Sequence, residues 1–223
     1  GDPFFWGMKS IMTIHNLKFQ GVWDVKTVKG LSGLPQSLFT PDKLEFKKDA
    51  NMLKGGLVYA DAITTVSPTY AEEIKTPFYG EGLDGLLRAR SNDLRGILNG
   101  IDYDAFNPET DPYITNRYNA VNFRKEKIKN KRALQADMGL EQNDKTMLIG
   151  IVSRLTDQKG FDLIAYMMDE LCQDNVQIIV LGTGEERYEN MFRHFAWKYN
   201  GKVSAQIYYS EELSHRIYAA SDA

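Results

Sequence analysis

The sequence holds little of the chemistry that cysteine and histidine provide. Cys172 is the single cysteine among 223 residues, which excludes an intrachain disulfide and a cysteine-rich zinc site. Three histidines are present, but they form no HExxH pattern, and neither CxxC nor GxSxG occurs. The missing patterns exclude zinc proteases of that type, thiol redox modules and α/β-hydrolases. No metal site is therefore expected.

The chain also lacks a surplus of basic residues and a long apolar run. Its formal net charge of −3 at pH 7 argues against a general nucleic-acid binder. No apolar run approaches the roughly 18 residues of a membrane span, and the opening "GDPFFWGMKS" lacks the order of a secretion signal. Hydrophobic residues make up 43% and charged residues 26%, which is typical of a globular protein. We expect a cytoplasmic protein without nucleic-acid or membrane partners.

Short apolar runs alternate with helical segments in the first hundred residues. A strand is expected over residues 10–14, in "SIMTI". A helix is expected over residues 49–59, and a second strand follows it in "DAITTVS". Pro68 suits the first turn of the next helix, and Ser67 suits its N-cap, because a serine hydroxyl accepts from an unpaired backbone N–H.

A turn and a linker are expected where this first part ends. The short strand "RGIL" precedes Asn99 and Gly100, a pair typical of a tight turn because both residues tolerate positive φ. The apolar periodicity then lapses over residues 101–118, which also hold two prolines. We therefore predict two domains, residues 1–100 and 119–223, joined by a linker over residues 101–118.

The second half of the chain has a regular alternation of strands and helices. The predicted strands are "TMLIGIVS", "VQIIVLG" and "KVSAQIYY", and the helices after them are "FDLIAYMMDELC", "ERYENMFRHFAWKY" and "EELSHRIYAA". Continuously apolar strands between amphipathic helices predict an α/β fold of Rossmann type, a parallel sheet covered by helices. Three strand–helix pairs make half of a doubly wound sheet, so we expect the chain to be an internal piece of a longer protein.

Two cations flank the turn after the first of these strands. In "VSRLTDQKGFDLI", Arg154 follows the strand end and Lys159 precedes the next helix. Ligands of open α/β sheets bind at the carboxyl ends of strands, and a helix N-terminus favours an anion. A guanidinium and an ammonium at that place suit a phosphate or diphosphate. The alternative, favoured by spacing alone, is a pair of ordinary surface cations.

Glycine, histidine and tyrosine supply weaker candidates. In "LGTGEERYE", Gly182 and Gly184 permit close backbone approach, but Arg187 stands at the third glycine position of a dinucleotide fingerprint. A tight strand–helix turn is the favoured interpretation of the two glycines. His15 follows the first strand, beside Asn16, where loop chemistry is expected. The tyrosines of "QIYYSEEL" suit a stacking face, although packing is their default role.

Six motifs together resemble a known family. In order they are "TIHNLKFQG", "LKGGLVYADAITTVSPTYAEEI", "EGLDGLLRAR", "GILNGID", "VSRLTDQKG" and "HRIYAASDA". They are closely similar to motifs of the bacterial glycogen synthases and plant starch synthases, over essentially the whole chain. The resemblance implies a GT-B glycosyltransferase of two Rossmann-like domains. It also implies transfer of glucose from ADP-glucose to the non-reducing end of an α-1,4-glucan, with retention of configuration and without a cofactor.

The resemblance also implies roles for individual residues. Arg154 and Lys159 look like the pair that holds the donor diphosphate and stabilises the leaving ADP. His15 looks like the residue at the sugar end of the site, and Asn99 resembles an asparagine that positions the donor glucose. Tyr209 looks like the aromatic residue on the adenine, although "IYY" departs from the more usual "IGY" of the family. Neighbouring residues complete the predicted substrate-binding set, namely Asn16 and Gly182.

Two family segments are missing from the sequence. "KTGGL", which supplies another donor-binding lysine, and "EPCGL", whose glutamate binds the donor sugar, do not occur. We therefore expect the chain by itself to be inactive. Because half of a doubly wound sheet leaves a sheet edge or apolar faces uncovered, we also expect the chain to self-associate. The alternative function is a non-catalytic nucleotide- or glucan-binding module with the same fold. An oxidoreductase is disfavoured by the broken glycine pattern.

Overall fold

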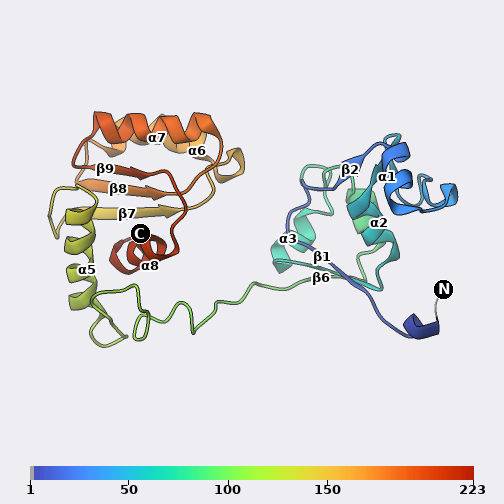
Figure 1. The fold of residues 1–223 in the computed structure, drawn as a ribbon, viewed down its shortest axis with the longest axis horizontal. Coiled ribbons are helices and arrows are strands. Elements are labelled where there is room, and N and C mark those ends of the chain that lie inside the picture. The colour runs from blue at the N-terminus through green and yellow to red at the C-terminus, as the bar shows by residue number, and fades with distance from the viewer. Residues whose placement is uncertain (1–2) are drawn as a thin grey trace. The chain divides into compact units, whose positions relative to one another are not determined.

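The computed structural model describes residues 3–223, and the chain divides into two compact units between Gly100 and Ile101 (Figure 1). Each unit holds its own apolar core and its own parallel sheet. Among the described residues, no helix is both long and apolar enough to cross a membrane.

The first unit is built on a three-stranded parallel sheet with β5 in the middle. Its strands are β1 (Ile11–Ile14), β5 (Ala62–Thr65) and β6 (Leu94–Gly96), in the order β1-β5-β6. The helices beside it are α2 (Met52–Tyr59), α3 (Pro68–Glu73) and α4 (Asp84–Ala89). Ile14, Ile63 and Leu57 are almost completely buried in the core between these elements. Burial of such apolar surface stabilises the unit by about 25 cal/mol per Å².

A small antiparallel sheet interrupts the predicted pattern of the first unit. Its strands are β2 (Val22–Trp23), β3 (Glu45–Phe46) and β4 (Asp49–Asn51), in the order β2-β4-β3, and α1 (Val25–Ser32) follows β2. The prediction of a helix from residue 49 is therefore wrong for its first three residues. Ala50 pairs with strands on both sides, and the helix begins only after Asn51, whose side chain accepts from Lys54 N.

The two predicted turn signals of the first unit have different outcomes. Ser67 caps α3 by accepting from Tyr70 N at 2.9 Å, with Pro68 in the first turn, as predicted. The predicted turn at Asn99 and Gly100 is wrong, because residues 97–102 form no turn and neither Asn99 nor Gly100 has a positive φ. The chain leaves β6 in an irregular segment and turns only after Asp102, whose carboxylate accepts from two following N–H groups.

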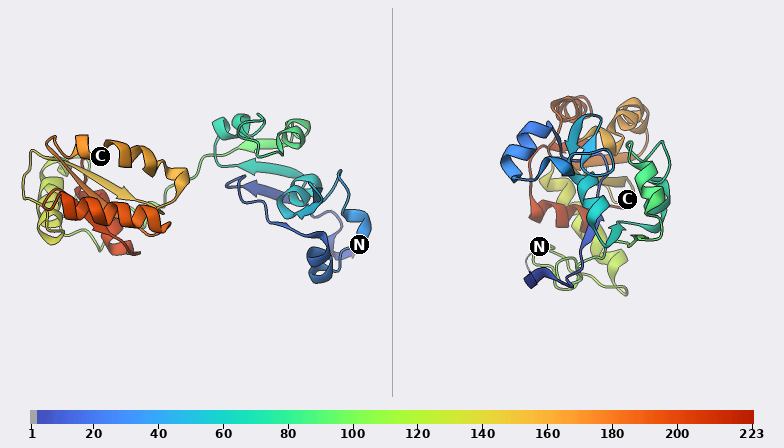
Figure 2. Two further views of the ribbon diagram at one scale, coloured as in Figure 1. Left: turned by 90° about the horizontal axis from the view of Figure 1, so that it is seen from above. Right: turned by 90° about the vertical axis from the view of Figure 1, so that its right-hand side faces the viewer.

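The second unit is an open parallel sheet with helices on both faces. Its strands are β7 (Met147–Val152), β8 (Val176–Leu181) and β9 (Val203–Gln206), in the order β7-β8-β9. Its helices are α5 (Phe123–Asp137), α6 (Phe161–Leu171), α7 (Glu186–Lys198) and α8 (Glu211–Ala220). Helices α6 and α7 cover one face and α5 and α8 the other, as Figures 1 and 2 show from two directions.

The central strand β8 is continuously apolar because both of its faces are buried. Ile178 and Val180 belong to the core with α6 and α7, whereas Ile179 and Leu181 belong to the core with α5 and α8. Successive side chains of a strand point to opposite faces, so a sheet covered on both faces requires apolar residues at every position. Beside β7, the backbone of Asp222 and Ala223 pairs with Leu148 and Gly150.

The stretch over residues 101–118 contains turns but no helix or strand, and part of it docks on α8. Asp111 and His215 are both buried, with 2.6 Å between Asp111 Oδ2 and His215 Nδ1. Phe106 stacks on the imidazole at 4.7 Å between ring centroids, and Ile114 is buried nearby. The domain boundaries stay a prediction, but specific contacts hold this segment to α8 within the second unit.

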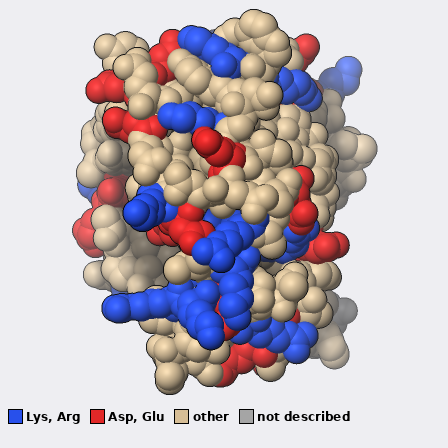
Figure 3. Space-filling view, turned by 90° about the vertical axis from the view of Figure 1, so that its left-hand side faces the viewer, with Lys and Arg blue, Asp and Glu red and all other residues tan. Residues whose placement is uncertain are grey.

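Basic side chains gather on the face seen in Figure 3. Helix α5 carries the half-buried Lys127 and four exposed cations, which are Arg124, Lys125, Lys129 and Arg132. Lys129 pairs with Glu126, and Arg132 pairs with Asp144. The cluster is local, because the whole chain has a formal net charge of −3.

Candidate functional site

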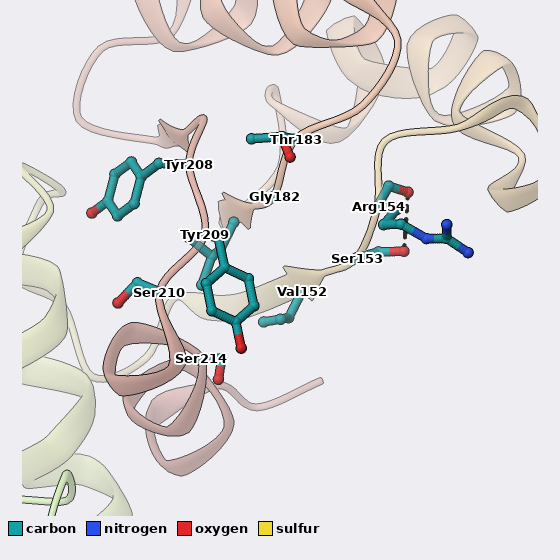
Figure 4. Close-up of a pocket in the computed structure, with 10 residues that line it drawn as sticks. Val152, Ser153, Arg154, Gly182, Thr183, Tyr208, Tyr209, Ser210 and Ser214 are labelled. Atoms are coloured by element: carbon teal, nitrogen blue, oxygen red, sulfur yellow. Dashed lines mark hydrogen bonds between the residues drawn. The ribbon is translucent and has the colours of Figure 1, made fainter.

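A pocket of about 230 Å³ opens at the carboxyl ends of the strands of the second unit (Figure 4). Its walls come from the loops after β7, β8 and β9 and from the first turn of α8. The lining residues are Val152, Ser153, Arg154, Leu181, Gly182, Thr183, Tyr208, Tyr209, Ser210 and Ser214. This is the edge of an open α/β sheet at which ligands bind.

The floor of the pocket depends on Gly182. Its N–H donates to Gln206 O at 3.1 Å, and the neighbouring Ser153 N–H donates to Leu181 O at 3.1 Å. A Cβ atom at Gly182 would lie 1.9 Å from Ser153 O, and the residue has φ +154°. Only glycine fits there. The favoured interpretation of Gly182 and Gly184, a tight strand–helix turn, agrees with the four-residue connection between β8 and α7, and Gly182 lines the pocket as well.

Helix α7 holds the loop that follows Gly182. The backbone N–H of Gly184 donates to Glu189 Oε1 at 2.9 Å. This bond, together with Arg193, holds the pKa of the Glu189 carboxyl below its ordinary value. Leu155 N donates to Thr183 O at 2.9 Å, which joins the same loop to the one after β7. The two loops that carry the pocket are thus fixed to each other and to a helix.

Arg154 lies at the rim of the pocket with an unengaged guanidinium. Its side chain is exposed, and within residues 3–223 it makes no hydrogen bond or ion pair. Figure 4 shows the guanidinium pointing away from Tyr209. An exposed side chain without a partner can change rotamer at small cost, so a ligand in the pocket could recruit this cation.

Lys159 lies beyond the pocket lining, in the short 3₁₀ turn η3 (Asp157–Lys159). Gly160 follows with φ +70° and leads into α6. The Lys159 ammonium is exposed and has no partner within the described part of the chain. The structure therefore brings Arg154, Gly182 and Tyr209 to one pocket, whereas Lys159 stands on the adjoining turn.

Tyr209 stands at the mouth of the pocket with 86% of its surface exposed. The predicted strand included Tyr208 and Tyr209, which is wrong. Strand β9 ends at Gln206, so both tyrosines lie in the loop after it. The ring offers a flat apolar face, which suits stacking on a base or sugar.

Hydroxyl groups of the pocket were missed by the sequence analysis. Ser210 caps α8 by accepting from Leu213 N at 3.1 Å, and Ser214 lies one turn later. Ser153 and Thr183 each stand just after an apolar strand. Each of these two residues lies one or two positions beyond a strand end, which is where ligand-binding residues are expected. Serine and threonine are so common at turns, however, that this position alone does not identify them as site residues.

The remaining predicted site residues belong to the first unit. His15 is exposed immediately after β1, and the Asn16 side chain accepts from Lys18 N at 3.0 Å. Asn99 is exposed in the irregular segment after β6. His15 and Asn16 do lie at a carboxyl strand end, as predicted, and the roles of all three residues stay predictions. Within residues 3–223, no three His, Cys, Asp or Glu side chains are grouped as metal ligands.

Fold and pocket together define an α/β protein of two Rossmann-like units with a ligand pocket at the edge of a parallel sheet. Residues 1–89 match the family model of the starch synthase catalytic domain. The chain is 70% identical to glycogen synthase of Lachnospira eligens over 220 residues and 64% identical to that of Lachnoclostridium phytofermentans over 222 residues. These matches cover 99% and 100% of this chain and 46% of each relative.

A solved structure is similar over the same length. The catalytic domain of starch synthase IV from Arabidopsis thaliana, bound to ADP and acarbose, has a TM-score of 0.89 and 33% identity, covering 99% of this chain and 48% of that one. The chain thus spans about half the length of its curated relatives. The predicted resemblance to glycogen synthases and starch synthases is confirmed along almost the whole chain, as is the predicted α/β fold of GT-B type.

Proposed function

We propose that this chain is part of a glycogen synthase that transfers glucose from ADP-glucose to the non-reducing end of an α-1,4-glucan with retention of configuration. The observation that carries the proposal is the pocket at the strand ends, which combines an aromatic face, hydroxyls and a free guanidinium. Similarity to glycogen synthases along 99% of the chain supports it. The chain covers 46% of those relatives. We therefore assign the activity to a longer protein and expect the chain alone to be inactive.

The second unit holds the nucleotide end of the donor. The Tyr209 ring packs on the adenine, an arrangement that gains dispersion and excludes water from one face of the base. Ser210 and Ser214 stand at the start of α8, where backbone N–H groups and hydroxyls can donate to the ribose or to phosphate oxygens. The similar starch synthase IV structure contains ADP, which supports a nucleotide diphosphate as the ligand class.

Arg154 and Lys159 act on the diphosphate. Negative charge grows on the ADP as the bond between glucose C1 and the phosphate oxygen breaks, so both cations bind the transition state better than the ground state. Arg154 can donate two parallel hydrogen bonds to phosphate oxygens, whereas Lys159 supplies a mobile point charge.

The residues that we propose to act on the sugar belong to the first unit. His15 and Asn99 orient the glucosyl group, and Asn16 stands beside His15. The acceptor 4-hydroxyl attacks C1 on the face that the diphosphate leaves, and its proton passes to the departing phosphate oxygen, so configuration is retained. This chemistry requires close positioning of both substrates.

The test is kinetic and uses a longer protein. Residues 1–223 replace their counterpart in the Lachnospira eligens glycogen synthase, to which they are 70% identical. Transfer of labelled glucose from ADP-glucose to glycogen is expected, and Arg154→Ala and Lys159→Ala should each lower kcat by a factor of about 10² to 10³ with a smaller effect on KM. Wild-type kcat in both variants would refute the proposed roles. ADP binding without any transfer would support a non-catalytic binding module instead.

A further inference from the structure

A cluster of charged side chains ties the turn that carries Lys159 to the start of α7. Asp157 Oδ1 accepts from Arg187 Nη2 at 2.8 Å and from the Tyr188 hydroxyl at 2.9 Å. The backbone N–H of Asp157 donates to Glu185 Oε1 at 2.9 Å. Three bonds therefore hold a single residue, which stands two positions before Lys159.

Arg187 is the centre of this cluster. Its Nε donates to Glu185 Oε2 at 2.9 Å while Nη2 reaches Asp157, and its guanidinium lies 4.4 Å from the centroid of the Tyr188 ring. Two carboxylates thus neutralise a cation that stands near the pocket. Arg187 therefore differs from Arg154 and Lys159, because its guanidinium is engaged by carboxylates of the protein.

Backbone bonds continue the connection toward the pocket. Glu185 N donates to Leu155 O at 2.8 Å, and Leu155 pairs with Gly184 as an isolated bridge. Hydrogen bonds therefore attach the loop after β7 to the end of β8 and the loop after it, from Ser153 as far as Asp157. Lys159 lies just beyond these attachments. The Asp157 carboxylate, two positions before Lys159, attaches this turn to Arg187 and Tyr188 at the start of α7.

We propose that Asp157, Glu185 and Arg187 form a positioning device, which holds the turn of Lys159 against α7 so that the ammonium meets the diphosphate of the bound nucleotide. The inference rests on the proposed function, because it requires an ADP-type ligand in the pocket. None of these three residues lines the pocket, so they act through Lys159 and are not catalytic residues.

A purely stabilising role makes a different prediction. The side chains of Arg187, Asp157 and Glu185 are 58%, 61% and 41% exposed, and exposed ion pairs contribute little to stability. Their loss would then change the melting temperature slightly and would leave ligand selectivity unaltered. A positioning role instead affects ligands that carry a diphosphate and spares those that do not.

Calorimetric titration of the 223-residue chain with ADP and with adenosine separates the two roles. Arg187→Ala and Asp157→Asn should each weaken ADP binding by about fivefold and leave adenosine binding unchanged. A simple charge effect predicts opposite changes in ADP affinity for the two variants. Arg187→Ala removes a positive charge and would weaken ADP binding, whereas Asp157→Asn removes a negative charge and would strengthen it. Lys198→Ala is the control, since it removes a cation from the same helix that pairs with Asp169, away from the turn.

The outcomes are distinct. Weaker ADP binding in both variants, with unchanged adenosine binding and a normal Lys198→Ala control, supports the device. Unchanged or stronger ADP binding in Asp157→Asn overturns it, even if Arg187→Ala fails to fold. Failure of the unaltered chain to bind ADP overturns this inference, whereas the proposed transfer activity is tested separately by the kinetics of the longer protein.

Discussion

Substitution of Gly182 by alanine should damage the second unit more than its small size suggests. The new methyl group would lie 1.9 Å from Ser153 O, a backbone atom that cannot swing aside, and the residue would keep φ +154°. Overpacking costs about 1–3 kcal/mol, and an unfavourable backbone conformation adds about 1–3 kcal/mol. We therefore expect Gly182→Ala to lower the free energy of unfolding by about 3 kcal/mol or more.

The matched control is Gly139→Ala in the same unit. Gly139 has φ +69°, but no atom lies within 4 Å of its added Cβ, so only the backbone term of about 1–2 kcal/mol applies. At about 4 °C per kcal/mol, thermal unfolding should show a loss of about 12 °C for Gly182→Ala and clearly less for the control. ADP binding should be weakened only in Gly182→Ala. Equal melting temperatures for the two variants, or unchanged ADP binding in Gly182→Ala, would refute the reasoning.

Two further predictions concern packing and pH. His215→Ala should remove the partner of Asp111 and the stacking surface of Phe106. We expect the free energy of unfolding to fall by about 2–4 kcal/mol and proteolysis within residues 101–118 to become faster. An unchanged digestion pattern would contradict the docking of this segment on α8. The hydrogen bond from Lys9 lowers the pKa of Asp61 from 3.8 to about 2, so its stabilising effect is complete above pH about 4 and disappears toward pH 2. The melting temperatures of wild type and Asp61→Asn should therefore differ at pH 6 and converge by pH 2, and a constant difference would argue against this pair.

The second unit could be predicted from the sequence because its local and global requirements agree. Ile178 and Ile179 face opposite cores, so strand β8 is apolar throughout and is easily recognised. The Ser67 cap was equally predictable, because it depends on residues next to it in sequence. Arg154 was noticed because a cation stood directly after a strand, whereas the proposed roles of Arg154 and Tyr209 came from the resemblance of their motifs to a known family.

Features that depend on distant partners could not be predicted. Strands β2 and β3 have two residues each, too short for a pattern, and they exist because both pair with β4. The contact between Asp111 and His215 joins residues 104 positions apart, so nothing local announces it. Arg187 was interpreted only as a break in a glycine pattern, and its contact with Asp157 became visible only in the folded chain.

A crystal structure of the chain grown with ADP would test the central claim most directly. The account predicts adenine against Tyr209, with the diphosphate within hydrogen-bond distance of Arg154 and Lys159 at the carboxyl ends of β7 and β8. Arg154 would have to leave the orientation of Figure 4 to make that contact. ADP bound elsewhere on the chain, or at this pocket with its diphosphate directed away from both cations, would contradict the account.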